Sequence, residues 1–198
     1  MSSFPINADN WALGASLENY VNSMETFQEV MQRRLLEVQL LPDEIARFSR
    51  LKTPVKISVL SEDWCIDCVM TLPIVARLAA VAPVIELKLF SRSKWPVLKE
   101  YYNSRGIMSI PVYSFLTSEF VEFGTFVERP LLAAQKMTEW KAAHPEVDQI
   151  RRSFSMSSEE KSTRLAAIRA QMQTEMEGWY RDGCQSALLD EFAAILGI

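Results

Sequence analysis

Apolar residues recur every three or four positions in the first part of the chain, behind Ser16, a residue type that commonly caps helices. This spacing predicts one amphipathic helix that ends before Pro42. A short second helix is expected through Ile45 and Phe48. The apolar positions of the first helix are Leu17, Tyr20, Met24, Phe27, Met31, Leu35 and Val38.

The pattern changes in the middle of the chain, where short apolar runs alternate with segments of helical spacing. Four such runs are typical of strands, and a turn near Thr117 makes the last two a hairpin. The runs are 55–60, 84–90, 110–116 and 119–126. Helices are expected between them at 69–80, where Pro73 should kink the helix, and at 95–103.

Helical spacing returns from Arg129 onward. A segment at 131–143 comes first, and the spacing of Ser157 and Glu160 is typical of a capping box that opens another helix. Gly183 should separate this helix from the last one. The apolar stripe of the long helix consists of Leu165, Ile168, Met172, Met176 and Trp179.

The order of elements predicts an α/β fold in which the first two strands flank a helix and therefore run parallel. The length of 198 residues favours a single domain over 1–198. Its core is expected at about 52–144, with an N-terminal helical segment at 1–51 and a C-terminal helical extension at 145–198.

Composition excludes several classes of protein. The net charge of -4 argues against general nucleic-acid binding, and no run of 18 apolar residues exists, so no membrane span is expected. The first twenty residues lack a basic region followed by an apolar run, and three cysteines are few for an exported protein held by disulfides. We therefore expect a cytoplasmic location.

The candidate chemistry lies in SEDWCIDCVM, at the junction between the first strand and its helix. Cys65 should stand near the helix N-terminus, where unpaired N–H groups and the helix dipole favour a thiolate. Cys68, one turn further on, would lie within reach but away from water. This arrangement suits a nucleophile and a resolving thiol.

A zinc site completed by His144 and Cys184 is the main alternative, although their spacing matches no zinc module. The remaining alternatives are that the two thiols are inert, or that the domain is used only for binding.

Two motifs resemble the thioredoxin family. WCIDC followed by VMTLPIVARLA resembles its active site and kinked helix, and GIMSIPVYSFL resembles the strand that begins with a cis-proline facing the cysteines. The resemblance covers about residues 52–130, and the longer string resembles bacterial members that carry Asp before the second cysteine. It implies a thioredoxin-like fold, a central mixed sheet flanked by helices, here with added N- and C-terminal helices.

The resemblance also implies roles for individual residues. Cys65 would be the nucleophile and Cys68 the resolving cysteine of a thiol–disulfide oxidoreductase. Four residues are expected to contact substrate: Trp64, Ile66, Ile110 and Pro111. Three acids are candidates for tuning the cysteines: Glu62, Asp63 and Asp67. Because like charge disfavours a thiolate, these acids predict a weakly oxidising, reducing pair. Val59 stands where the family carries a buried acid, and it cannot transfer protons.

The expected partners are a disulfide-containing protein or small molecule, and a reductase or dithiol that recycles the cysteines. No bound cofactor or metal is expected, since the cysteines carry the electrons and no glycine-rich dinucleotide motif is present. The added helices would cover the sheet, form a homodimer or dock a partner. In the last case the protein would be a redox-dependent interaction module without general reductase activity.

Overall fold

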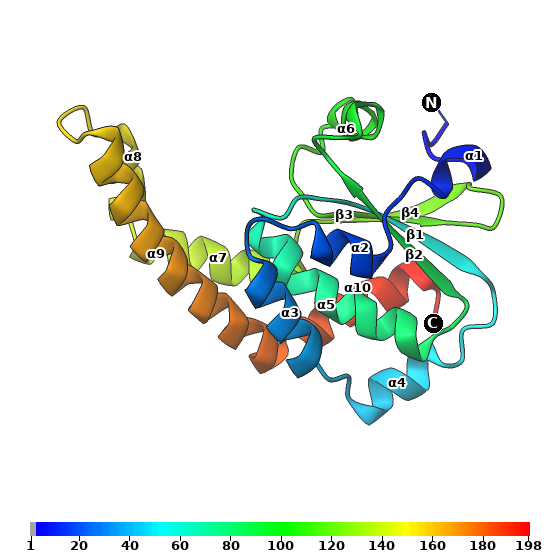
Figure 1. Ribbon diagram of the computed structural model, residues 1–198. Helices are drawn as coiled ribbons and strands as arrows, with labels where there is room; N and C mark the ends of the chain where they lie inside the picture. The colour runs from blue at the N-terminus through cyan, green and yellow to red at the C-terminus, as the bar shows by residue number, and fades with distance from the viewer. Residues whose placement is uncertain (1–2) are drawn as a thin grey trace. The chain divides into compact units, whose positions relative to one another are not determined.

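The computed structural model describes residues 3–198 (Figure 1). They form two compact units, which we describe separately. The first runs up to Arg129 and also includes Leu188–Ile198; the second is Pro130–Ala187. This division differs from the boundaries expected from the sequence, because the C-terminal residues belong with the sheet. The prediction of a single domain stays a prediction.

A mixed four-stranded sheet forms the centre of the first unit within the described residues, as the order of elements predicted. Its strands lie in the order β2-β1-β3-β4, with β1 parallel to β2 and antiparallel to β3. Helix α5 (Ile66–Val81) connects β1 to β2. The strands are β1 (Val55–Ser61), β2 (Ile85–Ser91), β3 (Val112–Leu116) and β4 (Glu122–Val127). Since Leu60 pairs with Val112, the end of β1 lies beside the start of β3.

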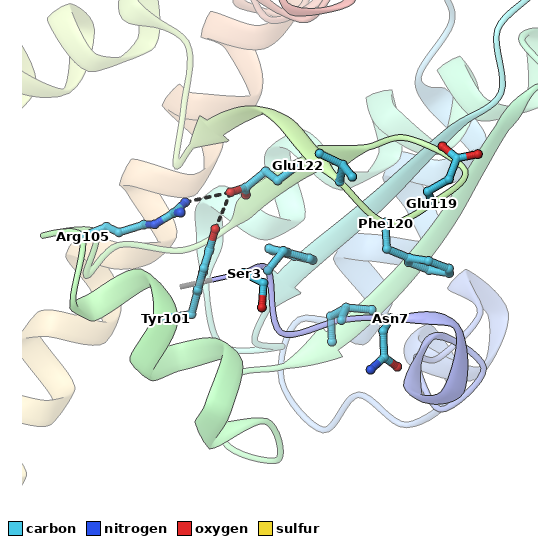
Figure 2. Close-up of a pocket in the computed structure, with 10 residues that line it drawn as sticks. Ser3, Asn7, Tyr101, Arg105, Glu119, Phe120 and Glu122 are labelled. Carbon is cyan, nitrogen blue, oxygen red and sulfur yellow. Dashed lines mark hydrogen bonds and ion pairs between the residues drawn. The ribbon is translucent and has the colours of Figure 1, made fainter. Parts of the chain in front are cut away.

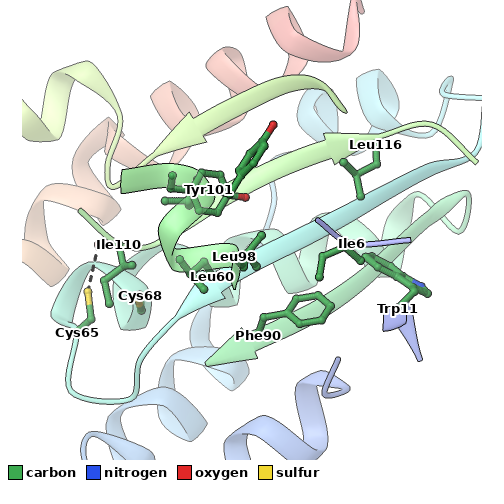
Figure 3. Close-up of a cluster of buried hydrophobic side chains, with 12 residues drawn as sticks. Ile6, Trp11, Leu60, Cys65, Cys68, Phe90, Leu98, Tyr101, Ile110 and Leu116 are labelled. Carbon is green, nitrogen blue, oxygen red and sulfur yellow. Dashed lines mark hydrogen bonds between the residues drawn. The ribbon is translucent and has the colours of Figure 1, made fainter. Parts of the chain in front are cut away.

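Helices cover both faces of this sheet (Figure 1). Helices α1 (Ala8–Trp11) and α6 (Pro96–Asn103) lie on one face, over a buried cluster that includes Leu60, Phe90 and Val112 (Figure 3). Helix α5 and the end of α10 (Gln185–Leu196) lie on the other.

Phe192 of α10 is fully buried, with its ring centroid 4.9 Å from that of Phe115 and 5.4 Å from that of Tyr113. The last helix is therefore part of the sheet's hydrophobic core.

The single helix predicted behind Ser16 is wrong: the segment forms two helices, α2 (Leu17–Asn22) and α3 (Gln28–Glu37). Ser16 does cap the first, because its hydroxyl accepts the backbone N–H of Asn19 at 3.2 Å. The break has a tertiary cause. The Asp63 carboxylate accepts the backbone N–H groups of Glu25 (2.8 Å) and Thr26 (3.0 Å), which fixes a turn between the helices. The short helix expected next is α4 (Pro42–Phe48).

Pro73 lies inside α5 and leaves one helix carbonyl without its usual donor. That carbonyl belongs to Val69, four residues earlier, since proline has no N–H. Arg34, buried on α3, donates from Nε to the Val69 oxygen at 3.2 Å and from Nη2 to the Met70 oxygen at 3.0 Å. A side chain from a neighbouring helix thus satisfies the backbone group that the proline leaves unpaired.

The second unit is helical. It contains α7 (Leu131–Ala143), α8 (Glu146–Arg152), α9 (Ser158–Trp179), the irregular turn η1 (Tyr180–Cys184) and the start of α10. The predicted capping box is present: Ser157 Oγ accepts from Glu160 N at 3.1 Å, and the Glu160 carboxylate accepts from Ser157 N at 2.8 Å. Gly183 has φ 124° and marks the expected break.

Of the predicted apolar stripe, Met176 is buried, and the other four residues are half-buried. The short helices α1 and α8 were not predicted. Across residues 3–198, no helix is long and apolar enough to cross a membrane.

Candidate functional site

The two cysteines of the C-x2-C motif lie at the start of α5. Cys65 is the N-cap residue and Cys68 lies in the first turn; both are free thiols and approach each other to 3.2 Å. The Cys65 N–H donates to the Glu62 carbonyl at 3.2 Å, and the Cys65 carbonyl accepts from Val69 N. These bonds join strand, turn and helix, so the motif occupies the strand–helix junction that the sequence predicted. Cys65 retains 8% exposure and Cys68 only 1%.

The second motif meets the first at Ile110. The Cys65 thiol donates to the Ile110 carbonyl oxygen, with Sγ and O 3.3 Å apart (Figure 3). The Ile110–Pro111 peptide bond is cis, as the resemblance implied. Residues 45 positions apart are thus brought together, because β1 and β3 are neighbours in the sheet.

Cys68 is almost completely enclosed by protein. Burial raises the pKa of its thiol well above the ordinary value, and the hydrogen bond and charge of Cys65 raise it further. Hydrogen bonds from the Ser61 hydroxyl and the Glu62 backbone act in the opposite direction. Cys68 is therefore held as a thiol, whereas Cys65 is the sulfur that retains some exposure to solvent.

The three acids predicted to tune the cysteines all have partners in the structure. Glu62 is buried and accepts the Ser93 N–H at 2.5 Å, and Asp63 holds the turn between α2 and α3. Asp67 forms an ion pair with Arg129, with Oδ2 and Nη2 2.5 Å apart; their side chains are 6% and 12% exposed. The charge of Asp67 is thus compensated by a cation that sequence reasoning did not assign.

The predicted substrate-contacting residues differ in exposure. Trp64 is 56% exposed, Ile66 is half-buried, and Ile110 and Pro111 are buried. The roles of all these residues in binding substrate stay predictions.

The zinc alternative finds no further ligands in the described structure. Residues 3–198 contain no group of three or more His, Cys, Asp or Glu side chains that could hold a metal ion. His144 instead stacks on Trp140, with ring centroids 4.1 Å apart, and its Nδ1 lies 2.8 Å from the Trp140 carbonyl. Cys184 is buried, and burial raises the pKa of its thiol.

A separate open pocket of about 470 Å³ contains none of the predicted site residues (Figure 2). The Glu122 carboxylate at its edge accepts from Tyr101 Oη at 2.6 Å and Arg105 Nη1 at 2.7 Å. These polar groups are occupied by one another, so the pocket adds no chemistry to the cysteine pair.

Comparison with known proteins gives a family and a fold. A thioredoxin family model matches residues 14–141. Among solved structures, a protein of unknown function from Pseudomonas aeruginosa is 26% identical with a TM-score of 0.59, over 72% of this chain and 89% of that chain. An HIV epitope-scaffold is similar in fold, with 19% identity and a TM-score of 0.62, over 99% of this chain and 98% of that chain. No curated protein matched.

Proposed function

The chain belongs to the thioredoxin family, and from this premise we propose that it is a thiol–disulfide oxidoreductase. It would reduce disulfides of proteins or small molecules through Cys65 and Cys68. One observation carries the proposal: a free C-x2-C pair at a helix N-terminus lies against the residue that precedes a cis-proline. This arrangement brings a nucleophile, a resolving thiol and the backbone of the segment before β3 together.

The reaction takes place in two exchanges. The Cys65 thiolate attacks one sulfur of the substrate disulfide, which forms a mixed disulfide and releases the first substrate thiolate. The Cys68 sulfur then attacks Cys65 Sγ, forms the Cys65–Cys68 disulfide and releases the second substrate thiolate. Two electrons pass to the substrate, and the leaving thiolates take up the two protons that the cysteines lose.

The surroundings of Cys65 suit an extended substrate. Pro111 has no N–H to donate to a neighbouring strand, and we infer that the backbone of Ile110 pairs instead with an extended peptide that adds as a strand. The exposed ring of Trp64 and the half-buried Ile66 offer apolar contacts beside the nucleophile. We infer that these residues, with Ile110, form the contact surface.

The catalytic cycle requires a source of electrons. We infer that a reductase or small dithiol of the reducing cytoplasm regenerates the Cys65–Cys68 dithiol, because such pairs stay reduced only in a reducing compartment. The protein itself needs no bound cofactor for the exchange.

Reduction of insulin by dithiothreitol, followed as turbidity, tests the proposal. The wild-type protein should accelerate the reaction, and Cys65→Ala should abolish the acceleration. Cys184→Ala is the matched control: it removes another buried thiol, so it should keep the rate. A wild-type rate equal to that of dithiothreitol alone would reject a general reductase and favour a redox-dependent interaction module.

The substrate can be identified by stopping the reaction after its first exchange. With Cys68→Ala, the mixed disulfide on Cys65 cannot be resolved and should persist. Mass spectrometry of this species, isolated from the cell, would name the substrate, and a Cys65→Ala/Cys68→Ala double variant should trap nothing.

A further inference from the structure

The resolving step requires Cys68 to act as a thiolate inside the protein. Cys68 is 1% exposed, and Val59, also fully buried, occupies the position where the family resemblance placed an acid. Hydroxyl side chains, rather than an acid, lie near the Cys68 sulfur. Ser61, at the end of β1, is fully buried and its hydroxyl hydrogen-bonds to Cys68. Tyr20 of α2 reaches the same hydroxyl, with Oη and Ser61 Oγ 2.9 Å apart.

These two hydroxyls have a preferred direction of donation. Burial raises the pKa of Tyr20, so its phenol stays protonated at neutral pH. A phenol is a better donor and a poorer acceptor than an aliphatic alcohol, so Tyr20 donates to Ser61. A hydroxyl has one proton, and that of Ser61 is then free to point at the Cys68 sulfur.

We propose that Ser61 is a catalytic residue that donates a hydrogen bond to the Cys68 thiolate during resolution, and that Tyr20 is a positioning residue that orients Ser61. The inference rests on the proposed function. In the step itself, Cys68 loses its proton and attacks Cys65 Sγ, the sulfur–sulfur bond to the substrate breaks, and the released substrate thiolate takes up a proton. The hydroxyls of Ser61 and Tyr20 stabilise the thiolate of Cys68 and are neither oxidised nor reduced.

The other ionisable groups near this sulfur do not replace the hydroxyl pair. Tyr113, from β3, shares a hydrogen bond of 2.8 Å with the Thr71 hydroxyl, which itself donates to the Asp67 carbonyl. After burial, the charge of Cys68 raises the pKa of Tyr20 most, and those of Asp63 and Glu62 raise it further. Cys65 is the remaining neighbour, and during resolution its sulfur is in the mixed disulfide.

One equivalent of an aromatic disulfide, 5,5′-dithiobis(2-nitrobenzoate), provides a direct test in a Cys184→Ala background. Each protein molecule should release two coloured thiolates in stopped flow. The first release reports attack by Cys65, and the second reports resolution by Cys68. Ser61→Ala is compared with Ser58→Ala, a buried serine of the same strand whose hydroxyl has no partner. Tyr20→Phe is compared with Tyr102→Phe, whose buried hydroxyl hydrogen-bonds to a different serine, Ser114, at 2.7 Å.

Loss of a hydrogen bond to a charged group should move the pH midpoint of the second release upward by about one to two units. The higher nucleophilicity of the more basic thiolate offsets about half of this on a logarithmic scale, so the second release slows about 3- to 10-fold at fixed pH. Tyr20→Phe should slow it less, and should add little in a Ser61→Ala background. The first release should be unchanged.

The outcomes separate this inference from the proposed function. A second release that is as fast in Ser61→Ala as in Ser58→Ala, with the same pH midpoint, overturns the role of Ser61. Equal midpoints in Tyr20→Phe and Tyr102→Phe overturn the role of Tyr20. A wild-type protein that releases no thiolate, or only the first, overturns the proposed function and this inference with it.

Discussion

Replacing Arg129 with methionine should destabilise the protein strongly, because the change leaves a carboxylate buried without its cation. Asp67 and Arg129 are 6% and 12% exposed at the side chain and lie 2.5 Å apart, so their pairing is hardly screened by water. Methionine keeps much of the volume of arginine and removes only the charge and the donors. The variant removes the ion pairs of Arg129 with Asp67 and with the more exposed Glu128, so the contribution of Asp67 is isolated by the double variant below.

Removal of one partner of a buried ion pair costs about 3–5 kcal/mol. For a chain of this length, 1 kcal/mol corresponds to about 2–4 °C in Tm, so Arg129→Met should lower Tm by roughly 6–20 °C. Removing both charges should be much less harmful than removing one. The double variant Asp67→Asn/Arg129→Met should therefore be more stable than Arg129→Met alone.

Urea denaturation of the four proteins in this cycle measures the coupling between the two side chains. Arg33→Met is the surface control, because its ion pair with Glu37 is about half exposed and should contribute less than about 1 kcal/mol. The reasoning is refuted if Arg129→Met loses no more stability than Arg33→Met, or if Asp67→Asn fails to restore any of the loss.

Three further predictions concern stability, pH and substrate binding. Arg34→Met should lower the free energy of unfolding, measured in urea, by about 1–3 kcal/mol, because it leaves the Val69 carbonyl without a donor. The loss should be smaller in a Pro73→Ala background, where the residue at position 73 supplies a backbone N–H to this carbonyl. Because the unfolded chain loses the thiol proton near the ordinary pKa of 9.0 and the folded chain keeps it on Cys68, stability should fall as pH rises above 9, and Cys68→Ala should flatten this fall. Trp64→Ala should lower kcat/KM for insulin roughly 5- to 30-fold, equivalent to one or two kcal/mol, while attack on a small aromatic disulfide stays within about twofold.

Much of the fold could be predicted because its strands and helices have local signals. The two inner strands, β1 and β3, are buried on both faces or nearly so, and such strands are recognised as short continuous apolar runs. The cysteine motif could be placed at a strand–helix junction for the same reason, since the apolar run 55–60 precedes it and helical spacing follows it at 69–80. The cis bond before Pro111 was implied by the resemblance of its segment to the thioredoxin family.

The features that could not be predicted arise from contacts between distant segments. The break between α2 and α3 depends on Asp63, 38 residues from Glu25, and a periodic pattern contains no sign of it. The ion pair that compensates Asp67 joins residues 62 positions apart. A last helix was expected after Gly183, yet nothing local indicates that Phe192 packs on the sheet.

The tuning of the cysteines was predicted from three acids alone, because their partners lie far away in the sequence. The sequence shows three acids near Cys65 but not the groups that engage them, and it shows Val59 in place of an acid but not the hydroxyls of Ser61 and Tyr20 that approach Cys68. Hydroxyl side chains are common and carry no motif at this spacing. Their role can be inferred only from the contact between α2 and the end of β1 in the folded protein.

A redox titration of the Cys65–Cys68 pair tests the central claim most directly. Cys184→Ala protein would be equilibrated with dithiothreitol buffers of graded potential, and the disulfide fraction measured by mass after thiol alkylation. We predict a single reversible two-electron transition with a midpoint more negative than about -200 mV, in the range of reducing members of this chemistry. A pair that forms no disulfide at any potential, or one with a midpoint at or above about -180 mV, would contradict a reducing thiol–disulfide exchange centre.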